Sequence, residues 1–248
     1  MRRAKLSVNV NKYALLRNSR GHDAPNLLHA VDLCLEAGAH GITVHPRRDQ
    51  RHVRFDDVPT VAAHLRDRWP GVEYNVECED APEILDLVLE VRPEQVTLVP
   101  VTPGEITSDH GWRLPDDLER LRPTVRRLRD AGLRVSLFAD ADPDVIERFV
   151  DTGAHRVEIY TGPYAWAWGT AEQDEHLRRV LETARRAREA GLGVNAGHDL
   201  DRHNLAGLVP HGLVDEVSIG HAQIVRALEV GTHASVRELL DALGWTAA

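Results

Sequence analysis

The sequence predicts one closed barrel of eight parallel strands, the α/β class known as the (β/α)₈ or TIM barrel, with a few extra helices. The chain has 248 residues, the usual size of one complete barrel. Eight short apolar segments alternate with amphipathic helical patterns along it. No Gly-x-Gly-x-x-Gly turn follows the first strand, as it often does in an open doubly wound sheet, which is the alternative fold. We therefore expect residues 1–248 to form a single domain.

The expected strands are short and rich in Val and Ile, which is typical of parallel strands that are buried on both faces. They are Leu6–Asn9, Gly41–His45, Val72–Glu77, Gln95–Val99, Arg134–Phe138, Arg156–Tyr160, Gly193–Asn195 and Glu216–Ile219.

Helical patterns separate these strands. They cover residues 24–37, 58–68, 81–91, 118–131, 143–152 and 172–190, and a closing helix covers residues 236–243. Gly38, Gly132, Gly153 and Gly191 each follow a helical pattern and precede a strand, as glycine does where a helix ends in left-handed backbone. The repetition of helix, glycine and strand favours the closed barrel.

Charge and composition argue against several classes of function. The formal net charge is −9, so no overall basic face is available for nucleic acid or an anionic membrane. No segment approaches the roughly 20 apolar residues of a membrane helix, and Cys34 and Cys78 show neither zinc spacing nor a disulfide framework. We expect a cytoplasmic protein in which a local cluster of cations holds any anionic substrate.

One connection is longer than the others. Residues 100–115 follow the fourth expected strand and contain Pro, Gly, Thr, Ser and Asp. A long loop at this end of a barrel lies on the catalytic face, so we expect residues 100–115 to act as a lid.

Almost every expected strand leads to a side chain that can take part in chemistry. These side chains are Asn9, Asn11, Lys12, His45, Glu77, Asp140, Glu158, His198 and His221. The active site of a barrel lies at the carboxyl ends of its strands. A single polar residue there is more often a hydrogen-bonded structural group. Three histidines and two glutamates at one rim instead predict a catalytic centre.

Three segments indicate phosphate binding. Residues 16–21 and 45–52 each place arginines in an expected loop, where a guanidinium can hold an oxyanion with two parallel hydrogen bonds. Residues 218–222 end the last strand and open a helix, where backbone N–H groups beside Gly220 can bind an anion. A solvated charge run and an ordinary turn are the alternative interpretations of these segments.

Further motifs run along the chain in a fixed order. They are Val8-Asn9, residues 16–21, residues 41–45 with Arg47 and Arg51-His52, residues 75–77, 98–100 and 135–138, Glu158-Ile159 with Thr161-Gly162, and residues 194–198 and 219–222. In this order and spacing they resemble the pyridoxine 5′-phosphate synthase family of vitamin B6 biosynthesis. The resemblance covers essentially the whole chain.

The resemblance implies the condensation of 3-amino-2-oxopropyl phosphate with 1-deoxy-D-xylulose 5-phosphate. The products would be pyridoxine 5′-phosphate, inorganic phosphate and water, without a metal or an organic cofactor. It also implies that the protein is a homo-octamer.

The resemblance further implies a role for each residue that matches a family motif. His45 and Glu77 would accept protons, His198 would donate one, and Glu158 would assist proton transfer. The residues implied to hold the amino-ketone phosphate are Asn9, Arg20, Gly220 and His221, and those implied to hold the sugar phosphate are Arg47, His52 and Thr107.

Two places depart from the commonest family pattern. Asn11-Lys12 stands where most members have Asp-His, and Asp199 follows His198 where some members have Gly. We expect Asn11 and Lys12 to contact the sugar phosphate differently, with Lys12 supplying a positive charge. Any contact at Asp199 is expected through its backbone.

The residue types suit this chemistry. Imine formation, enolisation, phosphate elimination and ring closure require several proton transfers, and imidazole titrates near neutrality. A buried carboxylate at the rim can have its pKa raised enough to act as a base near pH 7. Since the substrate supplies the amine, the enzyme needs no lysine, and Lys5 and Lys12 are the only lysines among 30 basic residues.

Three other functions remain open. A Schiff-base aldolase could use Lys12 as its nucleophile. A metal-dependent isomerase or phosphodiesterase could use His45, Glu77, Glu158 and His198 as ligands. A barrel without catalytic activity could bind a phosphorylated metabolite.

Overall fold

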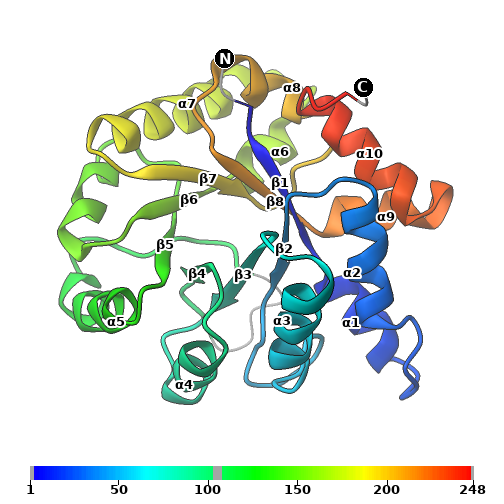
Figure 1. Ribbon diagram of the computed structural model, residues 1–248. Helices are drawn as coiled ribbons and strands as arrows, with labels where there is room; N and C mark the ends of the chain where they lie inside the picture. Colours follow the sequence, from blue (N-terminus) through cyan, green and yellow to red (C-terminus); the bar gives the residue numbers. More distant parts are fainter. Residues whose placement is uncertain (1–2, 103–107, 247–248) are drawn as a thin grey trace.

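The eight strands form a closed parallel barrel in a computed structural model that describes residues 3–102 and 108–246 (Figure 1). Each strand pairs with its neighbour in sequence, and β8 pairs with β1 to close the barrel. The strands are β1 (Lys5–Asn9), β2 (Gly41–Val44), β3 (Glu73–Cys78), β4 (Gln95–Leu98), β5 (Arg134–Ala139), β6 (Arg156–Tyr160), β7 (Gly193–Gly197) and β8 (Glu216–Ile219).

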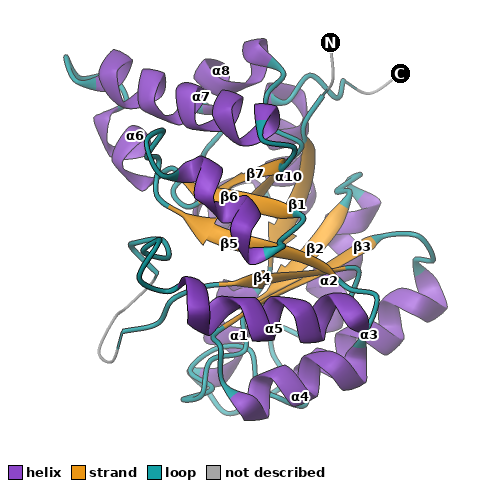
Figure 2. Cartoon of the chain, turned by 90° about the vertical axis from the view of Figure 1, so that its left-hand side faces the viewer, coloured by secondary structure: helices purple, strands orange, loops and turns teal. Residues whose placement is uncertain are grey.

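Helices cover the outside of the strands (Figure 2). The α-helices are α1 (Asn11–Asn18), α2 (Leu27–Glu36), α3 (Asp57–Arg68), α4 (Pro82–Val91), α5 (Leu118–Asp130), α6 (Gly162–Ala167), α7 (Gln173–Glu189), α8 (Leu205–Leu208), α9 (His221–Val230) and α10 (Thr232–Ala242). Two 3₁₀ helices, η1 (Ile146–Thr152) and η2 (Val209–His211), complete the described elements.

The predicted fold class is confirmed, and each predicted strand agrees with the structure to within two residues. Three predictions about helices are wrong. Residues 16–18 belong to α1 rather than to a loop, the helix expected at 143–152 is the 3₁₀ helix η1, and the closing helix begins at Thr232. Helix α6 was not predicted, because Gly162-Pro163 at its start resembles a turn.

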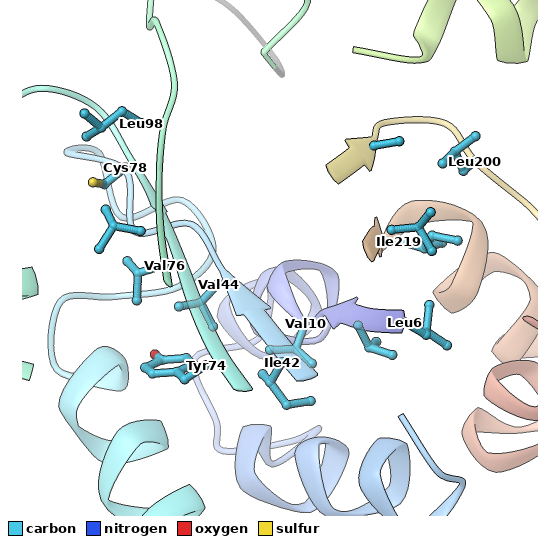
Figure 3. Packing of buried hydrophobic residues seen from close by; sticks show 14 of the residues in the cluster. Leu6, Val10, Ile42, Val44, Tyr74, Val76, Cys78, Leu98, Leu200 and Ile219 are labelled. Carbon is cyan, nitrogen blue, oxygen red and sulfur yellow. The ribbon is translucent and has the colours of Figure 1, made fainter. Parts of the chain in front are cut away.

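The strands alternate between apolar side chains that face the helices and polar side chains that face the barrel interior. Leu6, Ile42 and Tyr74 belong to the apolar core, and Figure 3 shows several of its members, among them Ile42 and Tyr74, between the strands and the surrounding helices. The inner positions instead hydrogen-bond to each other. The hydroxyls of Ser7 and Thr43, for example, lie 2.7 Å apart.

Hydrogen bonds also cross the barrel between strands that are not neighbours. Gln95 on β4 donates to Glu216 on β8 over 3.3 Å and accepts from Asn195 on β7 over 3.3 Å. The strands are buried on both faces, as expected, but the inner face is polar. Because side chains alternate along a strand, the residue two positions after an inner residue also faces inward. In this way His45 follows Thr43, and Glu77 follows Asn75, at the carboxyl ends of the strands.

The loop that follows β4 is packed against the barrel over its last described residues. Trp112 is buried, donates its backbone N–H to the Phe138 carbonyl over 3.0 Å, and donates its indole N–H to the Leu98 carbonyl over 2.8 Å. Residues 103–107 of the expected lid lie outside the described residues.

Among the described residues, no helix combines the length and the apolar character needed to span a membrane.

Candidate active site

A cavity of about 350 Å³ lies at the carboxyl ends of the strands. Its lining brings together most of the predicted site residues: Asn9, Asn11, Lys12, His45, Arg47, His52, Glu77, Glu158, His198, Asp199, Gly220 and His221. Two predicted residues are not among them. Arg20 is exposed and does not line the cavity, and Thr107 lies outside the described residues.

The structure adds residues that sequence reasoning missed. Leu15, Ser108 and Leu200 also line the cavity. Ser108 is buried, and its hydroxyl accepts a hydrogen bond from Arg47 over 3.3 Å. Because Ser108 lies in the long loop after β4, the sequence predicted that it is on the catalytic face. The sequence did not predict its contact with Arg47, which is 61 residues away. Leu15 lies in α1, which the sequence did not predict.

His45 and Glu77 form the closest acid–base pair in the described part of the cavity. The His45 Nδ1 lies 3.4 Å from the Glu77 Oε2, and the two side chains are each 5% exposed. The two residues come from the carboxyl ends of adjacent strands: His45 directly follows β2, and Glu77 is the penultimate residue of β3. Asn11 fixes the end of β2, because its side-chain oxygen accepts the His45 backbone N–H over 2.9 Å. Asn11 thus has a structural contact at the site, and its side-chain oxygen is engaged.

Two buried glutamates in this cavity have opposite shifts in pKa. Burial alone raises the pKa of Glu77, but its hydrogen bond with His45 and the charges of His45, His198 and Arg47 outweigh it, so the net shift is downward. Burial, followed by the charge of Glu77, raises the pKa of Glu158 well above its usual range. These shifts favour the ionised form of Glu77 and the protonated form of Glu158. The raised pKa expected at the rim belongs to Glu158, not to Glu77.

Gly197 leaves room for the neutral carboxyl of Glu158. A Cβ at this position would overlap the Glu158 Oε1. The other oxygen of that carboxyl, Oε2, is buried and makes no hydrogen bond to a described residue. In the pairing of β6 with β7, Glu158 lies opposite Asn195, and Gly197 lies two residues further along β7. The Glu158 carboxyl therefore reaches the end of β7, where only a glycine leaves space for it.

His198 follows Gly197 in an unusual backbone conformation. Its φ is 76° and that of Asp199 is 59°, so two consecutive non-glycine residues are left-handed. Such residues are uncommon and concentrate at functional sites. Burial lowers the pKa of His198, against the opposing effect of the Glu77 charge, so the imidazole is neutral at pH 7.

Cations and hydrogen-bond donors form one part of the cavity lining. Burial and the charges of His45 and Arg47 lower the pKa of His52 to about 3. The His52 Nδ1 accepts the Val53 backbone N–H over 2.9 Å, so the neutral ring carries its proton on Nε2. Lys12 lines the same cavity. A neutral donor beside two cations suits a phosphate group.

Arg17, in the segment interpreted as a phosphate clamp, binds protein instead. Its guanidinium donates to both oxygens of Asp57, over 2.6 and 2.7 Å, and its side chain is 7% exposed. The neighbouring Asn18 donates to the His52 carbonyl over 2.7 Å. These two residues attach α1 to the segment that carries His52 and to the start of α3, so this part of the motif positions the site.

Gly220 begins the turn into α9. A Cβ there would come within 2.9 Å of the Asn9 backbone oxygen, so only glycine permits this approach of β8 to the end of β1. The turn lines the cavity together with Ser218 and His221. Across residues 3–102 and 108–246, no three His, Cys, Asp or Glu side chains are grouped closely enough to hold a metal ion.

Comparison with solved structures supports the fold alone. The tryptophan synthase α-subunit of Pyrococcus furiosus aligns with a TM-score of 0.66 and 13% identity, covering 96% of this chain and 98% of that one. Phosphoribosylanthranilate isomerase from Thermotoga maritima aligns with a TM-score of 0.61 and 12% identity, covering 97% of this chain and 98% of that one.

Comparison of sequences identifies the family. Residues 6–244 match the family described as pyridoxal phosphate biosynthesis protein PdxJ. The pyridoxine 5′-phosphate synthase of Albidiferax ferrireducens is 52% identical over 244 residues, covering 95% of this chain and 96% of that protein. The protein of the same name from Mesorhizobium japonicum is 48% identical over 244 residues, covering 98% and 99%. The resemblance drawn from the motifs is confirmed, and the chain belongs to the pyridoxine 5′-phosphate synthase family of enzymes.

Proposed function

We propose that this enzyme condenses 3-amino-2-oxopropyl phosphate with 1-deoxy-D-xylulose 5-phosphate to give pyridoxine 5′-phosphate, inorganic phosphate and water. The observation that carries the proposal is the pair of buried glutamates, whose pKa values are shifted down for Glu77 and up for Glu158, in one cavity with two histidines. Two titratable groups whose surroundings separate their pKa values supply a base and an acid at the same pH.

The charges of the cavity support two phosphate sites. Arg47, His52 and Lys12 would hold the sugar phosphate, with Thr107 assigned there by the family resemblance alone. Asn9 and the backbone of the Gly220-His221 turn would hold the amino-ketone phosphate, because helix N-termini bind anions through free N–H groups. Holding both substrates in register converts a two-substrate reaction into one within a single complex.

The protonation states suggest an order of proton transfer. The amino ketone arrives as an ammonium ion, and neutral His198 can take its proton and free the amine to attack the sugar ketone. The resulting imidazolium returns the proton to the carbinolamine hydroxyl, which leaves as water. His198 thus donates only after it has first accepted. Glu77, with His45 beside it, is the base for the later removal of a proton from carbon.

The test is to mix the purified protein with both substrates and to follow pyridoxine 5′-phosphate and phosphate together. The proposal requires one phosphate for each product molecule and no product when either substrate is omitted. Failure of the wild-type protein to form the product would refute it. The hydrogen bond from Arg47 to Ser108 supports a role for residues 100–115 in holding the sugar phosphate. We also propose, from the family resemblance, that the protein is an octamer, and light scattering of the purified protein tests this.

Lys12 lines the cavity, so a Schiff-base aldolase has a candidate nucleophile. Borohydride reduction in the presence of a carbonyl substrate distinguishes the two reactions. A covalent adduct on Lys12 would support the aldolase, whereas the proposed condensation places the imine between the two substrates.

A further inference from the structure

We infer that Phe138, Tyr160 and the Thr161-Gly162 pair form a seat that fixes the imidazole of His198 for proton transfer. They are positioning residues that act through His198, and this role rests on the proposed function. Phe138 and Thr161-Gly162 belong to the motifs of the chain, yet none of them lines the cavity, so substrate contact does not explain their presence.

Two aromatic rings hold the imidazole from the sides. The His198 ring centroid lies 4.7 Å from that of Phe138 and 5.6 Å from that of Tyr160, the latter in an edge arrangement at 80°. Phe138 is fully buried and Tyr160 is 5% exposed, and with Val99 they form a small cluster separate from the main core. Contacts of this geometry are directional and restrict rotation of the ring.

The imidazole depends on this packing for its orientation. A catalytic histidine is usually oriented by a hydrogen bond from the ring nitrogen that does not react. The His198 Nδ1 is buried and makes no such bond to any residue within the described ranges. His45, by contrast, has its Nδ1 beside Glu77. Packing against Phe138 and Tyr160 therefore orients the His198 imidazole, as a hydrogen bond to a carboxylate or carbonyl does in other catalytic histidines.

Thr161 holds the backbone from which the imidazole projects. Its buried hydroxyl lies 2.7 Å from the His198 carbonyl oxygen and 2.5 Å from that of Gly197. Its backbone N–H also donates to the Gly197 carbonyl over 2.9 Å. The left-handed conformation of His198 is unfavourable for a residue with a side chain, and the Thr161 hydroxyl is placed to hold it.

Gly162 sets the position of the Tyr160 ring. A Cβ on Gly162 would overlap the Tyr160 hydroxyl and the ring carbon that carries it. The phenol ring thus lies directly over the Cα of Gly162, and any larger residue would displace the ring. Glycine at position 162 is therefore required for the Tyr160 ring to lie against the imidazole of His198.

The first test compares steady-state kinetics of matched variants. Phe138→Leu keeps an apolar side chain but removes the ring, and Thr161→Val keeps the shape but removes the hydroxyl. We expect each to lower kcat at least tenfold with KM changed less than twofold. The controls Tyr160→Phe and Thr161→Ser keep the ring and the hydroxyl, and we expect kcat within threefold of the wild type.

A double-mutant cycle separates positioning from a general loss of structure. In the background of His198→Asn, Phe138→Leu and Thr161→Val should cause no further loss in single-turnover rate, because the group through which they act is gone. Full additive losses in that background would overturn the inference, as would kcat values of the two variants equal to that of the wild type.

A titration without substrate tests the seat independently of the reaction. With [¹³C]ε1-labelled histidine, the His198 signal should titrate at higher pH in Phe138→Leu than in the wild type, because the smaller side chain admits water to the imidazole. An unchanged titration overturns the seat even if the enzyme is active. The shift in a protein that makes no pyridoxine 5′-phosphate supports the seat and refutes the proposed function instead.

Discussion

The His45 Nδ1 lies 3.4 Å from the Glu77 Oε2, and burial of both side chains keeps water from screening their interaction. The ionised Glu77 makes this pair the base of the proposed reaction. Glu77→Gln preserves shape and removes the base, so we expect kcat to fall by about 10² to 10⁴, with KM changed little. Steady-state kinetics on both substrates measure this, and a rise in KM at unchanged kcat would show that Glu77 only binds substrate.

We expect a different result for Glu158, because its burial and the charge of Glu77 raise its pKa and favour the protonated carboxyl. Glu158→Gln replaces one neutral group by another, so we expect the fold and substrate binding to be kept. A loss of kcat of tenfold or more in this variant would show that Glu158 transfers its proton. Activity equal to the wild type would instead mean that Glu158 serves only as a neutral hydrogen-bonding group.

Gly197→Ala tests the space that the neutral carboxyl needs. The added Cβ would overlap the Glu158 Oε1, so the carboxyl must move away from its place in the cavity. We expect kcat to fall at least tenfold. Gly191→Ala, at an open glycine before β7, is the control: its φ of 90° is left-handed, so an added Cβ strains the backbone there, but nothing lies near that Cβ. Gly197 is not among the left-handed glycines, so a larger loss in Gly197→Ala comes from the contact with Glu158. Equal activities of the two variants would contradict the steric account.

His52 gives the folded protein a dependence on pH whose sign is fixed by the shift. Its pKa is about 3 in the folded state and near 6.5 when unfolded. Below pH 6.5 only the unfolded chain takes up the proton, so the contribution to stability is complete above pH 6.5 and is lost as the pH falls. At pH 5 the loss is about 2 kcal/mol, at roughly 1.4 kcal/mol per pH unit.

The variant His52→Gln removes this term. Denaturant titrations at equal protein concentration should show that the free energy of unfolding of the wild type, relative to the variant, drops by about 2 kcal/mol between pH 7 and pH 5. The comparison cancels the other titrating groups. A difference that does not change with pH would contradict a neutral, buried His52.

Arg17 should matter for stability rather than for phosphate affinity. The Arg17–Asp57 pair is partly buried, and without Arg17 the Asp57 carboxylate keeps, among the described residues, only the Arg54 backbone N–H as a partner, which costs about 3 kcal/mol. Arg17→Met should therefore lower the free energy of unfolding by that amount, measured by denaturant titration. Arg20→Met, at an exposed residue of the same motif, should stay within about 0.5 kcal/mol of the wild type. Equal effects of the two changes would contradict the assignment.

The strands and the rim of the barrel were predictable because they follow from short-range pattern. His45, Glu77 and His198 stand at or just beyond strand ends, and the carboxyl ends of parallel strands meet in space. The inner polar face was present in the sequence as strict alternation in segments such as residues 74–77, whereas the Val- and Ile-rich composition indicated only that both faces are buried. The alternation places Glu77 and Glu158 inside the barrel.

Other features depended on tertiary contacts. The partner of Arg17 is 40 residues away, so nothing local distinguishes this buried ion pair from a phosphate clamp. The opposite pKa shifts of Glu77 and Glu158 arise from neighbours on other strands. Helix α1 was obscured because residues 16–21 resemble a charged loop, although its first residues carry the contact between Asn11 and His45.

A single-turnover experiment tests the central claim most directly. The wild type and Glu77→Gln are each mixed in excess with 3-amino-2-oxopropyl phosphate and 1-deoxy-D-xylulose 5-phosphate, and the quenched products are separated. The wild type should form pyridoxine 5′-phosphate and release one equivalent of phosphate, and the variant should form it at least a hundredfold more slowly. No product from the wild type, or equal rates from both proteins, would contradict an acid–base condensation at this site.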